Sequence, residues 1–331
     1  MATVDVRQLG STGLKVFPMA LGCMGMSPGM YGAVDENESI ATIHAALDAG
    51  VTLLDTGDFY GAGHNEMLIG RALEGHRDQA LLSVKFGALR SPDGSWGGVD
   101  TRPVAVRNFA AYSLKRLGVD HIDVYRPARL DPDVPIEDTM GAIADLIRAG
   151  YVRYAGLSEV GPDTIRRAHA VHPITDLQIE YSFISRGPEA EIFPVLQELG
   201  IGVTAYGVLS RGLLSGSRPH AQGDFRTHLP RFTGENFRHN ETTLEDLRRI
   251  ADEIGLSPAQ LAIAWVYSRG KYIVPVIGAR TRKQLRESLD ALPVKLSTAN
   301  LARVEEIISA SGIVGTRYDE RQMKMLDSEK K

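Results

Sequence analysis

The chain has 331 residues, of which 43% are hydrophobic and 24% charged, the balance of an ordinary globular protein. Its net charge of -4 gives no electrostatic reason to expect nucleic acid or an anionic membrane as a partner. The single cysteine, Cys23, excludes an internal disulfide and a zinc site built from cysteines. No apolar run approaches the roughly 20 residues of a membrane span, and residues 1–20 lack a signal-peptide core. We therefore expect a cytoplasmic protein with one domain over residues 1–331.

Short β-branched segments alternate with amphipathic ones, the order that parallel strands and crossover helices produce. The predicted strands are Met19–Gly22, Val51–Thr56, Ala80–Phe86, Ile122–Pro127, Val152–Ser158, Asp176–Ser182, Gly202–Val208 and Ile273–Ala279. The predicted helices are Asn37–Ala49, Asn65–Leu73, Pro103–Leu117, Ile136–Ala149, Asp163–His172, Glu189–Leu199, Pro258–Ser268 and Arg282–Leu289. Glycine ends several of them, in DAG, RAG and ELG, as left-handed helix caps require. These units predict an α/β protein folded as a (β/α)8 TIM barrel.

Other segments lie outside this repeat. Residues Gln8–Phe17, with GSTG at their centre, predict a hairpin under the barrel floor. The Gly-, Pro- and Arg-rich stretch Ser215–Asn240 follows the seventh strand, where barrel loops carry function. Thr242–Ile254 and Thr298–Ser309 are predicted as extra helices, and the charged tail Asp327–Lys331 as frayed.

A doubly wound sheet is the competing fold. That fold binds dinucleotides at a GxGxxG turn after its first strand, and the sequence LGCMGM at residues 21–26 is not such a turn. A nicotinamide cofactor would therefore have to bind here by other means.

Polar residues at the ends of the second and third strands predict the chemistry. DTGDFYG places Asp55 and Tyr60 there, and SVKFG places Lys85 on the neighbouring strand. A lysine inside an apolar run needs a carboxylate partner, and Asp55 is the nearest candidate. We expect the resulting cation to lower the pKa of Tyr60 and make it a general acid for carbonyl reduction. One buried Lys–Asp pair is more often structural, but three such residues at one barrel rim favour catalysis.

The sequence resembles the aldo-keto reductases of bacteria, plants and fungi, including the potassium-channel beta subunits. The matching motifs are GSTGLKV, LGCMGMS, LLDTGDFYGAGHNEMLIGRAL, SVKFG, LDPDVPIEDTMGAIADLIRAGYVRYAGLSE, LQIEYSFISR, VTAYGVLSRGLLSG, GENF, SPAQLAIAWV and VIGARTRKQLRES. They extend from about Arg7 to Tyr318, nearly the whole chain. The resemblance implies a TIM barrel that reduces carbonyl compounds with NADPH.

The family's catalytic set of Asp, Tyr, Lys and His carries over to Asp55, Tyr60 and Lys85, but the histidine does not. Where the family has QHR, this chain has Pro127, Ala128 and Arg129. Loss of one donor to a developing oxyanion lowers rates by about 10²–10³. Either the substrates are reactive aldehydes, dicarbonyls or quinones, or another donor such as Arg129 or His64 substitutes.

The resemblance also implies a cofactor site. Ser158 and Gln178 correspond to ligands of the carboxamide and Tyr206 to the aromatic residue that stacks on nicotinamide, while Glu159 replaces the usual asparagine. The basic residues after the eighth strand lie at a helix N-terminus, where their positive charge opposes the helix dipole unless an anion is bound. A 2′-phosphate would supply that anion, so these residues favour NADPH. The remaining positions expected at the cofactor are Gly22, Met24, Gly207, Leu209, Arg211, Gly278, Arg280, Arg282, Gln284 and Ser288.

Residues in or beside the mouth loops are expected to surround the substrate: Tyr31, Phe86, Trp96, Ala128 and Arg129. No histidine lies near carboxylates with metal-ligand spacing, so we expect no metal. The leading hypothesis is NADPH-dependent reduction of a small aldehyde or ketone. Ala128 keeps a second hypothesis open, a regulatory protein that binds NADPH and turns over slowly. A third is a lyase that forms a Schiff base at Lys85, which is disfavoured because an ammonium paired with Asp55 is a poor nucleophile. Self-association and the natural substrate also stay open.

Overall fold

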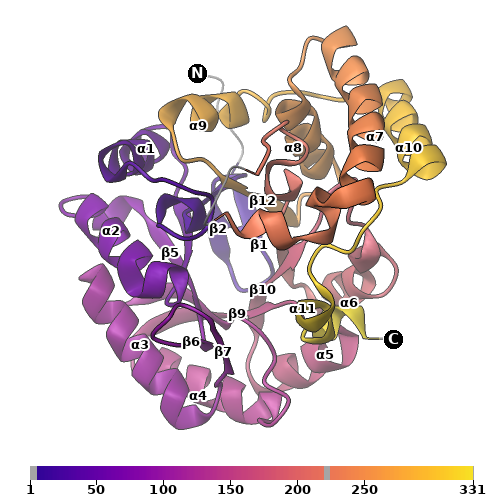
Figure 1. The fold of residues 1–331 in the computed structure, drawn as a ribbon. Coiled ribbons are helices and arrows are strands. Elements are labelled where there is room, and N and C mark those ends of the chain that lie inside the picture. The colour runs from indigo at the N-terminus through magenta and orange to yellow at the C-terminus, as the bar shows by residue number, and fades with distance from the viewer. Residues whose placement is uncertain (1–5, 220–223, 331) are drawn as a thin grey trace.

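The computed structural model describes residues 6–219 and 224–330 (Figure 1). Eight parallel strands close into a barrel in the order β10-β11-β12-β3-β4-β5-β8-β9. They are β3 (Ala20–Gly22), β4 (Leu53–Gly57), β5 (Leu81–Phe86), β8 (Ile122–Pro127), β9 (Val152–Ser158), β10 (Ile174–Glu180), β11 (Gly202–Tyr206) and β12 (Ile273–Gly278). The surrounding helices are α1 (Glu36–Asp48), α2 (His64–Ala72), α3 (Pro103–Leu117), α4 (Ile136–Arg148), α5 (Pro162–Val171), α6 (Ile192–Leu199), α8 (Pro258–Ser268) and α9 (Arg282–Leu289). The fold is a (β/α)8 TIM barrel, as predicted.

Alternating side chains along each strand divide the core into a barrel interior and an outer layer beneath the helices. On β5, Lys85 points inward to Asp55, and the next residue, Phe86, points outward. Phe86 stacks on Tyr125 with ring centroids 4.2 Å apart and lies near Phe109 of α3. Our placement of Phe86 in the substrate wall is therefore wrong, because the strand's alternation turns its ring away from the mouth.

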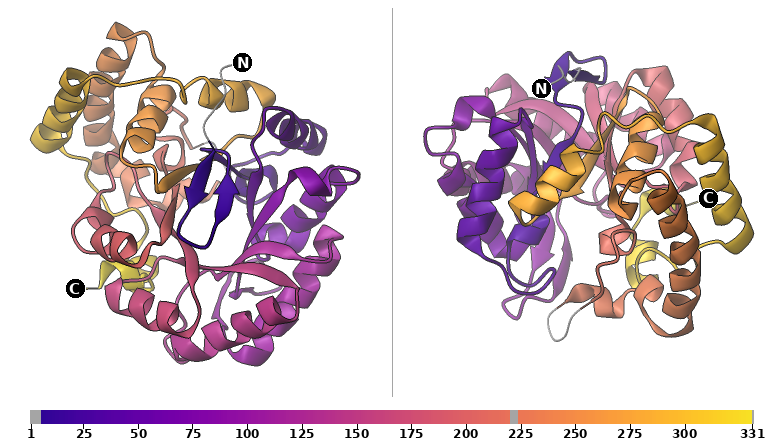
Figure 2. Two further views of the ribbon diagram at one scale, coloured as in Figure 1. Left: turned by 180° about the vertical axis from the view of Figure 1, so that it is seen from behind. Right: turned by 90° about the horizontal axis from the view of Figure 1, so that it is seen from above.

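The predicted N-terminal hairpin consists of β1 (Arg7–Leu9) and β2 (Leu14–Val16), which pair antiparallel. It lies across the end of the barrel seen in the left view of Figure 2. Its apolar residues join one buried cluster with inward-facing residues of the strands: Leu9, Leu14, Val16, Leu53, Val124 and Val274. Gly10 allows this close fit, since a Cβ there would lie 2.3 Å from the carbonyl oxygen of Thr175. The hairpin therefore seals the floor and leaves the opposite end as the mouth.

Predicted boundaries outside the barrel are less accurate. Helix α7 (Gly234–Glu253) begins well before Thr242, the predicted start. The residues before Thr242 are mostly polar and so gave no helical pattern of apolar residues, yet Asn240 is buried and donates to the carbonyls of Arg231 and Val314. Helix α10 (Thr298–Ser311) matches its prediction closely. The sequence did not predict the hairpin of β6 (Ala88–Arg90) and β7 (Trp96–Val99), nor the short helix α11 (Glu320–Lys324).

The C-terminal tail is held in place, contrary to our expectation of fraying. Asp327 accepts a hydrogen bond of 2.9 Å from the backbone N–H of Gly161, at the start of α5. The backbone N–H of Ser328 donates to the carbonyl of Glu159, and Glu329 forms an ion pair with Arg317. Figure 1 shows α11 and this segment on the mouth side, beside α5 and α6. Lys331, and residues 220–223 of the predicted loop, lie outside the described residues.

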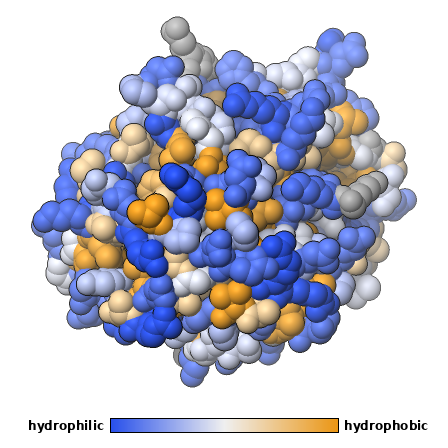
Figure 3. All heavy atoms as spheres, turned by 90° about the horizontal axis from the view of Figure 1, so that it is seen from below, coloured by the Kyte–Doolittle hydropathy of each residue, from blue (hydrophilic) through white to orange (hydrophobic). Residues whose placement is uncertain are grey.

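The outer surface is mixed in character. On the face drawn in Figure 3, hydrophilic residues predominate and hydrophobic residues form small separate groups. Among the described residues, no helix is both long and apolar enough to cross a bilayer.

Candidate active site

The predicted Lys–Asp pair exists at the mouth ends of β4 and β5. Lys85 Nζ lies 2.5 Å from Asp55 Oδ1, and both side chains are buried. The other Asp55 oxygen accepts hydrogen bonds from Ser83 Oγ at 2.9 Å and Gln178 Nε2 at 2.6 Å. Burial lowers the pKa of Lys85, and the Asp55 carboxylate opposes that change. The pair is therefore a compact, fully partnered unit with little net charge.

Tyr60 lies directly above this pair. Its ring centroid is 5.2 Å from Lys85 Nζ, and it begins a tight turn, Tyr60–Gly63, in which Ala62 has a φ of 51°. Positive φ is unfavourable for alanine and is tolerated mainly at functional sites. Among the described residues, the Tyr60 hydroxyl has no hydrogen-bond partner. The turn thus directs a phenol toward the mouth beside an ammonium group.

The expected lowering of the Tyr60 pKa is wrong. Burial raises the pKa of Tyr60 well above 10, and the Asp55 carboxylate raises it further. Asp55 already neutralises Lys85, so the phenol lies near an ion pair rather than near a free cation. Tyr60 is consequently protonated at neutral pH.

Ala128 occupies the end of β8 in the position expected from the sequence. It is buried, and its backbone N–H donates to the carbonyl of Phe86 at 2.8 Å. His64 does not replace the missing imidazole, because its ring bonds Ser27 Oγ at 2.9 Å and Glu36 at 2.7 Å. Arg129 does lie in the mouth, where Nη2 donates to the Tyr318 hydroxyl at 3.3 Å.

Two of the predicted substrate-wall residues lie at the rim. Tyr31 packs on Phe225 with centroids 5.4 Å apart, and burial raises the pKa of Tyr31 to about 12. The Arg90 guanidinium lies over two rings, those of Phe59 and of Trp96 in β7, at 5.9 Å from each ring centroid.

The positions expected to hold the carboxamide are adjacent. Ser158 of β9 pairs in register with Gln178 of β10, and both are buried. The Gln178 amide nitrogen donates to Asp55, while Ser158 Oγ has no partner among the described residues. Tyr206 ends β11, but its hydroxyl donates to Glu159 Oε1 at 2.7 Å. Glu159 is thus engaged within the protein.

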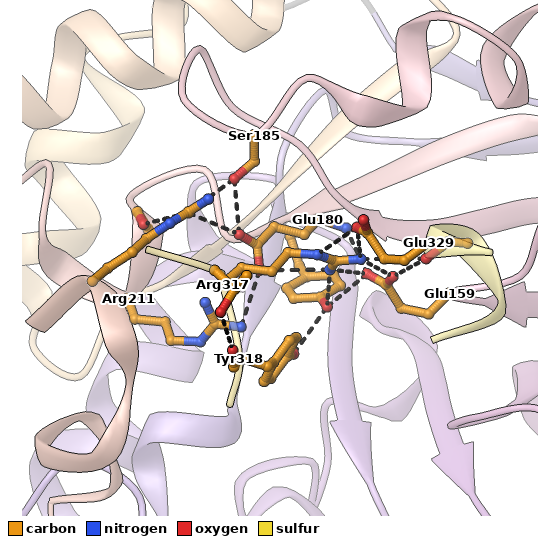
Figure 4. Close-up of polar contacts among 12 residues, drawn as sticks. Glu159, Glu180, Ser185, Arg211, Arg317, Tyr318 and Glu329 are labelled. Atoms are coloured by element: carbon orange, nitrogen blue, oxygen red, sulfur yellow. Dashed lines mark hydrogen bonds and ion pairs between the residues drawn. The ribbon is translucent and has the colours of Figure 1, made fainter. Parts of the chain in front are cut away.

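Glu159 anchors a cluster that the sequence did not predict (Figure 4). Arg317 donates to both Glu159 oxygens, at 2.8 and 2.5 Å, and lies 3.7 Å from Glu180. Arg211, expected at the pyrophosphate, instead pairs with Glu180 at 3.0 Å and lies over the Tyr318 ring. Arg317 lowers the pKa of Glu159 to about 2, even though burial acts in the opposite direction. The C-terminal segment is therefore bound to β9 and β10 by buried charges.

The loop after β11 carries the predicted Gly207 and Leu209. Gly207 has a φ of +67°, and a Cβ there would lie 2.8 Å from the Glu180 side chain. The backbone reverses through two further residues with positive φ, Ser210 at 44° and Arg211 at 55°. Only a glycine at 207 lets this loop approach Glu180 so closely.

The β12–α9 connection contains most of the residues that were predicted to bind the phosphate. Gly278 pairs with Gly22 between β12 and β3, and Met24 follows in the next turn. Arg280 donates to the carbonyl of Tyr31 at 3.0 Å, and its backbone N–H donates to Gln284.

Two residues in this region already have partners within the protein. The Arg282 side chain is already paired with Glu38 at 2.9 Å. Ser288 is buried and its hydroxyl donates to the carbonyl of Gln284 within α9, which leaves its oxygen available only as an acceptor.

Residues 18–309 match the model of the aldo/keto reductase family. The chain belongs to this family. Probable aldo-keto reductase 1 of Glycine max is 40% identical over 324 residues, covering 96% of this chain and 92% of that protein.

Solved structures agree. A glycerol dehydrogenase of Gluconobacter oxydans superposes with a TM-score of 0.84 at 28% identity, covering 96% of this chain and 98% of that one. An aldo-keto reductase of Bacillus halodurans, in its holo form, gives 0.76 at 26% identity, covering 96% and 99%. The protein is thus an aldo-keto reductase family oxidoreductase, and the general reaction of that family is carbonyl reduction with a nicotinamide cofactor.

The side chains of this aldo-keto reductase fit a nicotinamide. The unpartnered Ser158 hydroxyl lies beside Gln178, whose amide carbonyl is not engaged with Asp55, so a donor and an acceptor are available together. The surface hollows lined by His64 and Arg116, and by Arg7 and Tyr272, lie away from these residues. No group of three or more metal-binding side chains is found within residues 6–219 and 224–330.

Sequence reasoning missed a second buried pair deeper in this reductase's barrel. Arg126 of β8 lies 2.8 Å from Asp176 of β10 and also donates to Thr204 at 3.0 Å. Gly156 permits the pair, because a Cβ there would lie 2.9 Å from Asp176. The sequence did contain an indication of this pair, because Arg126 is a charged residue inside an apolar strand. The same kind of indication identified Lys85.

Proposed function

We propose that this aldo-keto reductase reduces small aldehydes or ketones with NADPH and that Tyr60 protonates the carbonyl oxygen. The observation that carries the proposal is the convergence of the Tyr60 phenol, the Lys85 ammonium and the Asp55 carboxylate at one rim. When bound, the nicotinamide supplies the hydride.

Proton transfer follows from the electrostatics of the rim. Burial raises the pKa of Tyr60, so the phenol holds its proton at neutral pH until an alkoxide develops next to it. The departing proton leaves a phenolate near the Lys85–Asp55 pair, with the Lys85 ammonium 5.2 Å from the ring centroid and the charge of Arg129 acting to lower the pKa of Tyr60. Asp55 keeps Lys85 in place, and Ser83 and Gln178 satisfy the remaining Asp55 oxygen.

The preference for NADPH rests on the start of α9. Arg280 and Arg282 lie at this helix N-terminus, which itself favours an anion. Glu38 pairs with Arg282 in this structure, and a phosphate would exchange with that half-buried carboxylate.

A regulatory NADPH-binding role is the second candidate. It is supported by Ala128, whose side chain offers no hydrogen-bond donor to a carbonyl oxygen. In that case the protein would bind cofactor and turn over slowly.

The test combines cofactor binding with turnover. Purified protein is titrated with NADPH and NADH by fluorescence, and absorbance at 340 nm is followed with aldehydes, dicarbonyls, quinones and ketones. Reduction of any class supports the enzyme. Tight binding with no oxidation of NADPH by any of them favours the regulatory protein, and borohydride trapping of a substrate on Lys85 would reveal a lyase.

A further inference from the structure

Arg129 is a cation in the mouth without a carboxylate partner. Two of its N–H groups are used, one on the Ala128 carbonyl and one on the Tyr318 hydroxyl at 3.3 Å. A guanidinium has five N–H donors, so three stay available. Within the described residues, no carboxylate lies within ion-pair distance of it. Such a group, half-buried and with unused donors, is suited to bind an oxygen anion.

The neighbouring guanidinium groups differ from it in this respect. Arg211 and Arg231 both contact Glu180, at 3.0 and 3.4 Å, and Arg317 binds Glu159. Their charges are thus largely offset inside the protein. Arg129 alone among these four forms no ion pair within the described residues, although its charge still acts on Glu159 from a longer distance.

Arg129 is also held in position within the mouth. Its guanidinium carbon lies 5.7 Å from the centroid of the Tyr318 ring, and its charge acts to lower the pKa of Tyr60 against the effect of burial. The Tyr318 hydroxyl, itself 3.0 Å from the Tyr206 hydroxyl, fixes one arm of the guanidinium. Tyr318 follows Arg317, whose bond to Glu159 anchors the segment. The C-terminal segment thereby sets the position of Arg129.

We propose that Arg129 donates a hydrogen bond to the substrate's carbonyl oxygen and so supplies the donor that Ala128 lacks. The inference rests on the proposed reductase function. As the oxygen gains negative charge, the fixed guanidinium stabilises it, while Tyr60 delivers the proton. Tyr318 is then a positioning residue for Arg129, and the C-terminal segment completes the active site.

The experiment compares variants on two substrates that differ in charge. NADPH-dependent reduction of 4-nitrobenzaldehyde and 4-carboxybenzaldehyde is measured for the wild type, Arg129→Leu, Arg129→Lys and Arg129→Leu/Ala128→His. Arg166→Leu, which removes an exposed arginine of α5, is the matched control. Circular dichroism and NADPH affinity check that each variant folds and binds cofactor.

We expect Arg129→Leu to lower kcat about 100-fold with both aldehydes, because a lost oxyanion donor acts on any carbonyl. NADPH affinity should not change. Adding Ala128→His to Arg129→Leu should raise kcat at least about tenfold again, because the histidine supplies a new hydrogen-bond donor to the carbonyl oxygen. If Arg129→Leu does not fold, Arg129→Lys carries the same test with a smaller loss. Tyr318→Phe should lower kcat with little change in KM or cofactor affinity, because it frees the guanidinium.

Three results would overturn the inference. If the Arg129→Leu enzyme is as active as wild type, Arg129 is not the donor, and the proposed reductase function is unaffected. If only the carboxylated aldehyde is affected, and only through a weaker apparent affinity, Arg129 binds a substrate carboxylate instead. A wild type that binds NADPH but reduces neither aldehyde, nor any other carbonyl, removes the reductase function and this inference together.

Discussion

The two sides of the mouth are built differently. On the β4–β5 side, one ammonium and one carboxylate form a balanced pair, Lys85 and Asp55, from neighbouring strands. On the β9–β11 side, the guanidinium groups of Arg211, Arg231 and Arg317 surround Glu159 and Glu180. The first side depends on strand register. The second depends on a segment more than a hundred residues further along the chain, since Glu159 and Arg317 are 158 positions apart.

The phenols of the two sides differ accordingly. Burial and Asp55 raise the pKa of Tyr60, whereas at Tyr318 burial is outweighed by Arg211 and Arg129, which lower its pKa. Balanced charges thus preserve a proton for transfer, and surplus cations stabilise negative charge. We infer that the mouth separates proton donation from anion binding.

The largest effect is expected at Tyr60. Tyr60→Phe keeps the ring over Lys85 and removes only the proton donor, so turnover should fall about 10²–10⁴-fold. NADPH affinity, measured by fluorescence titration, should stay nearly unchanged. Tyr112→Phe, at an exposed position on α3, is the control for loss of a hydroxyl. Equal activity of Tyr60→Phe and wild type would show that the acid lies elsewhere.

On the other side, Glu159→Gln should affect stability first. It leaves the buried Arg317 without its bidentate partner, and breaking such a pair destabilises by about 3–5 kcal/mol. Because the pKa of Glu159 falls from 4.5 to about 2 on folding, its contribution is full above pH 4.5 and is lost as pH falls toward 2.

Urea unfolding at pH 7 and pH 3 measures both effects of Glu159→Gln. The difference between wild type and variant should shrink at pH 3. Glu198→Gln, in an exposed pair with Arg166, should leave the unfolding midpoint nearly unchanged. A Glu159→Gln protein as stable as wild type would mean that the C-terminal segment is held by other contacts.

The same contrast explains what the sequence could predict. Asp55, Tyr60 and Lys85 were identified because each ends or follows a strand, and adjacent parallel strands bring such ends together. Arg317 and Tyr318 follow no strand, and nothing local indicates where a terminal segment packs. The prediction that the pKa of Tyr60 is lowered was wrong. The pKa depends on how closely the Asp55 carboxylate approaches the Lys85 ammonium, and sequence spacing does not give that distance.

Asp58, two residues before Tyr60, should make stability depend on pH. Burial raises its pKa from 3.8 to about 7, and the nearby Glu66 adds to this change. Folding therefore takes up a proton, so the stabilising contribution is full below about pH 4 and is lost as pH rises through 7. From pH 5 to 7 the loss is at most about 3 kcal/mol, at 1.36 kcal/mol per pKa unit.

Asp58→Asn removes this titration and keeps the shape of the side chain. Its stability advantage over wild type should be small at pH 5 and grow up to pH 7, as measured by urea unfolding at each pH. Asp93→Asn, in the exposed β6–β7 turn, should show no such trend. Parallel pH curves for wild type and Asp58→Asn would mean that the carboxyl is already ionised at pH 5.

The smallest effect concerns the cofactor's phosphate. Arg282→Leu removes one charge-assisted contact at the start of α9, so the Kd for NADPH should rise about tenfold while that for NADH stays the same. Arg286→Leu, in the last turn of the same helix, is the matched control. Glu38→Gln should act in the opposite direction, because it removes the carboxylate that occupies Arg282 at 2.9 Å. If Arg282→Leu weakens both cofactors equally, the basic turn does not read the 2′-phosphate, and the preference must come from Arg280 or from the mouth itself.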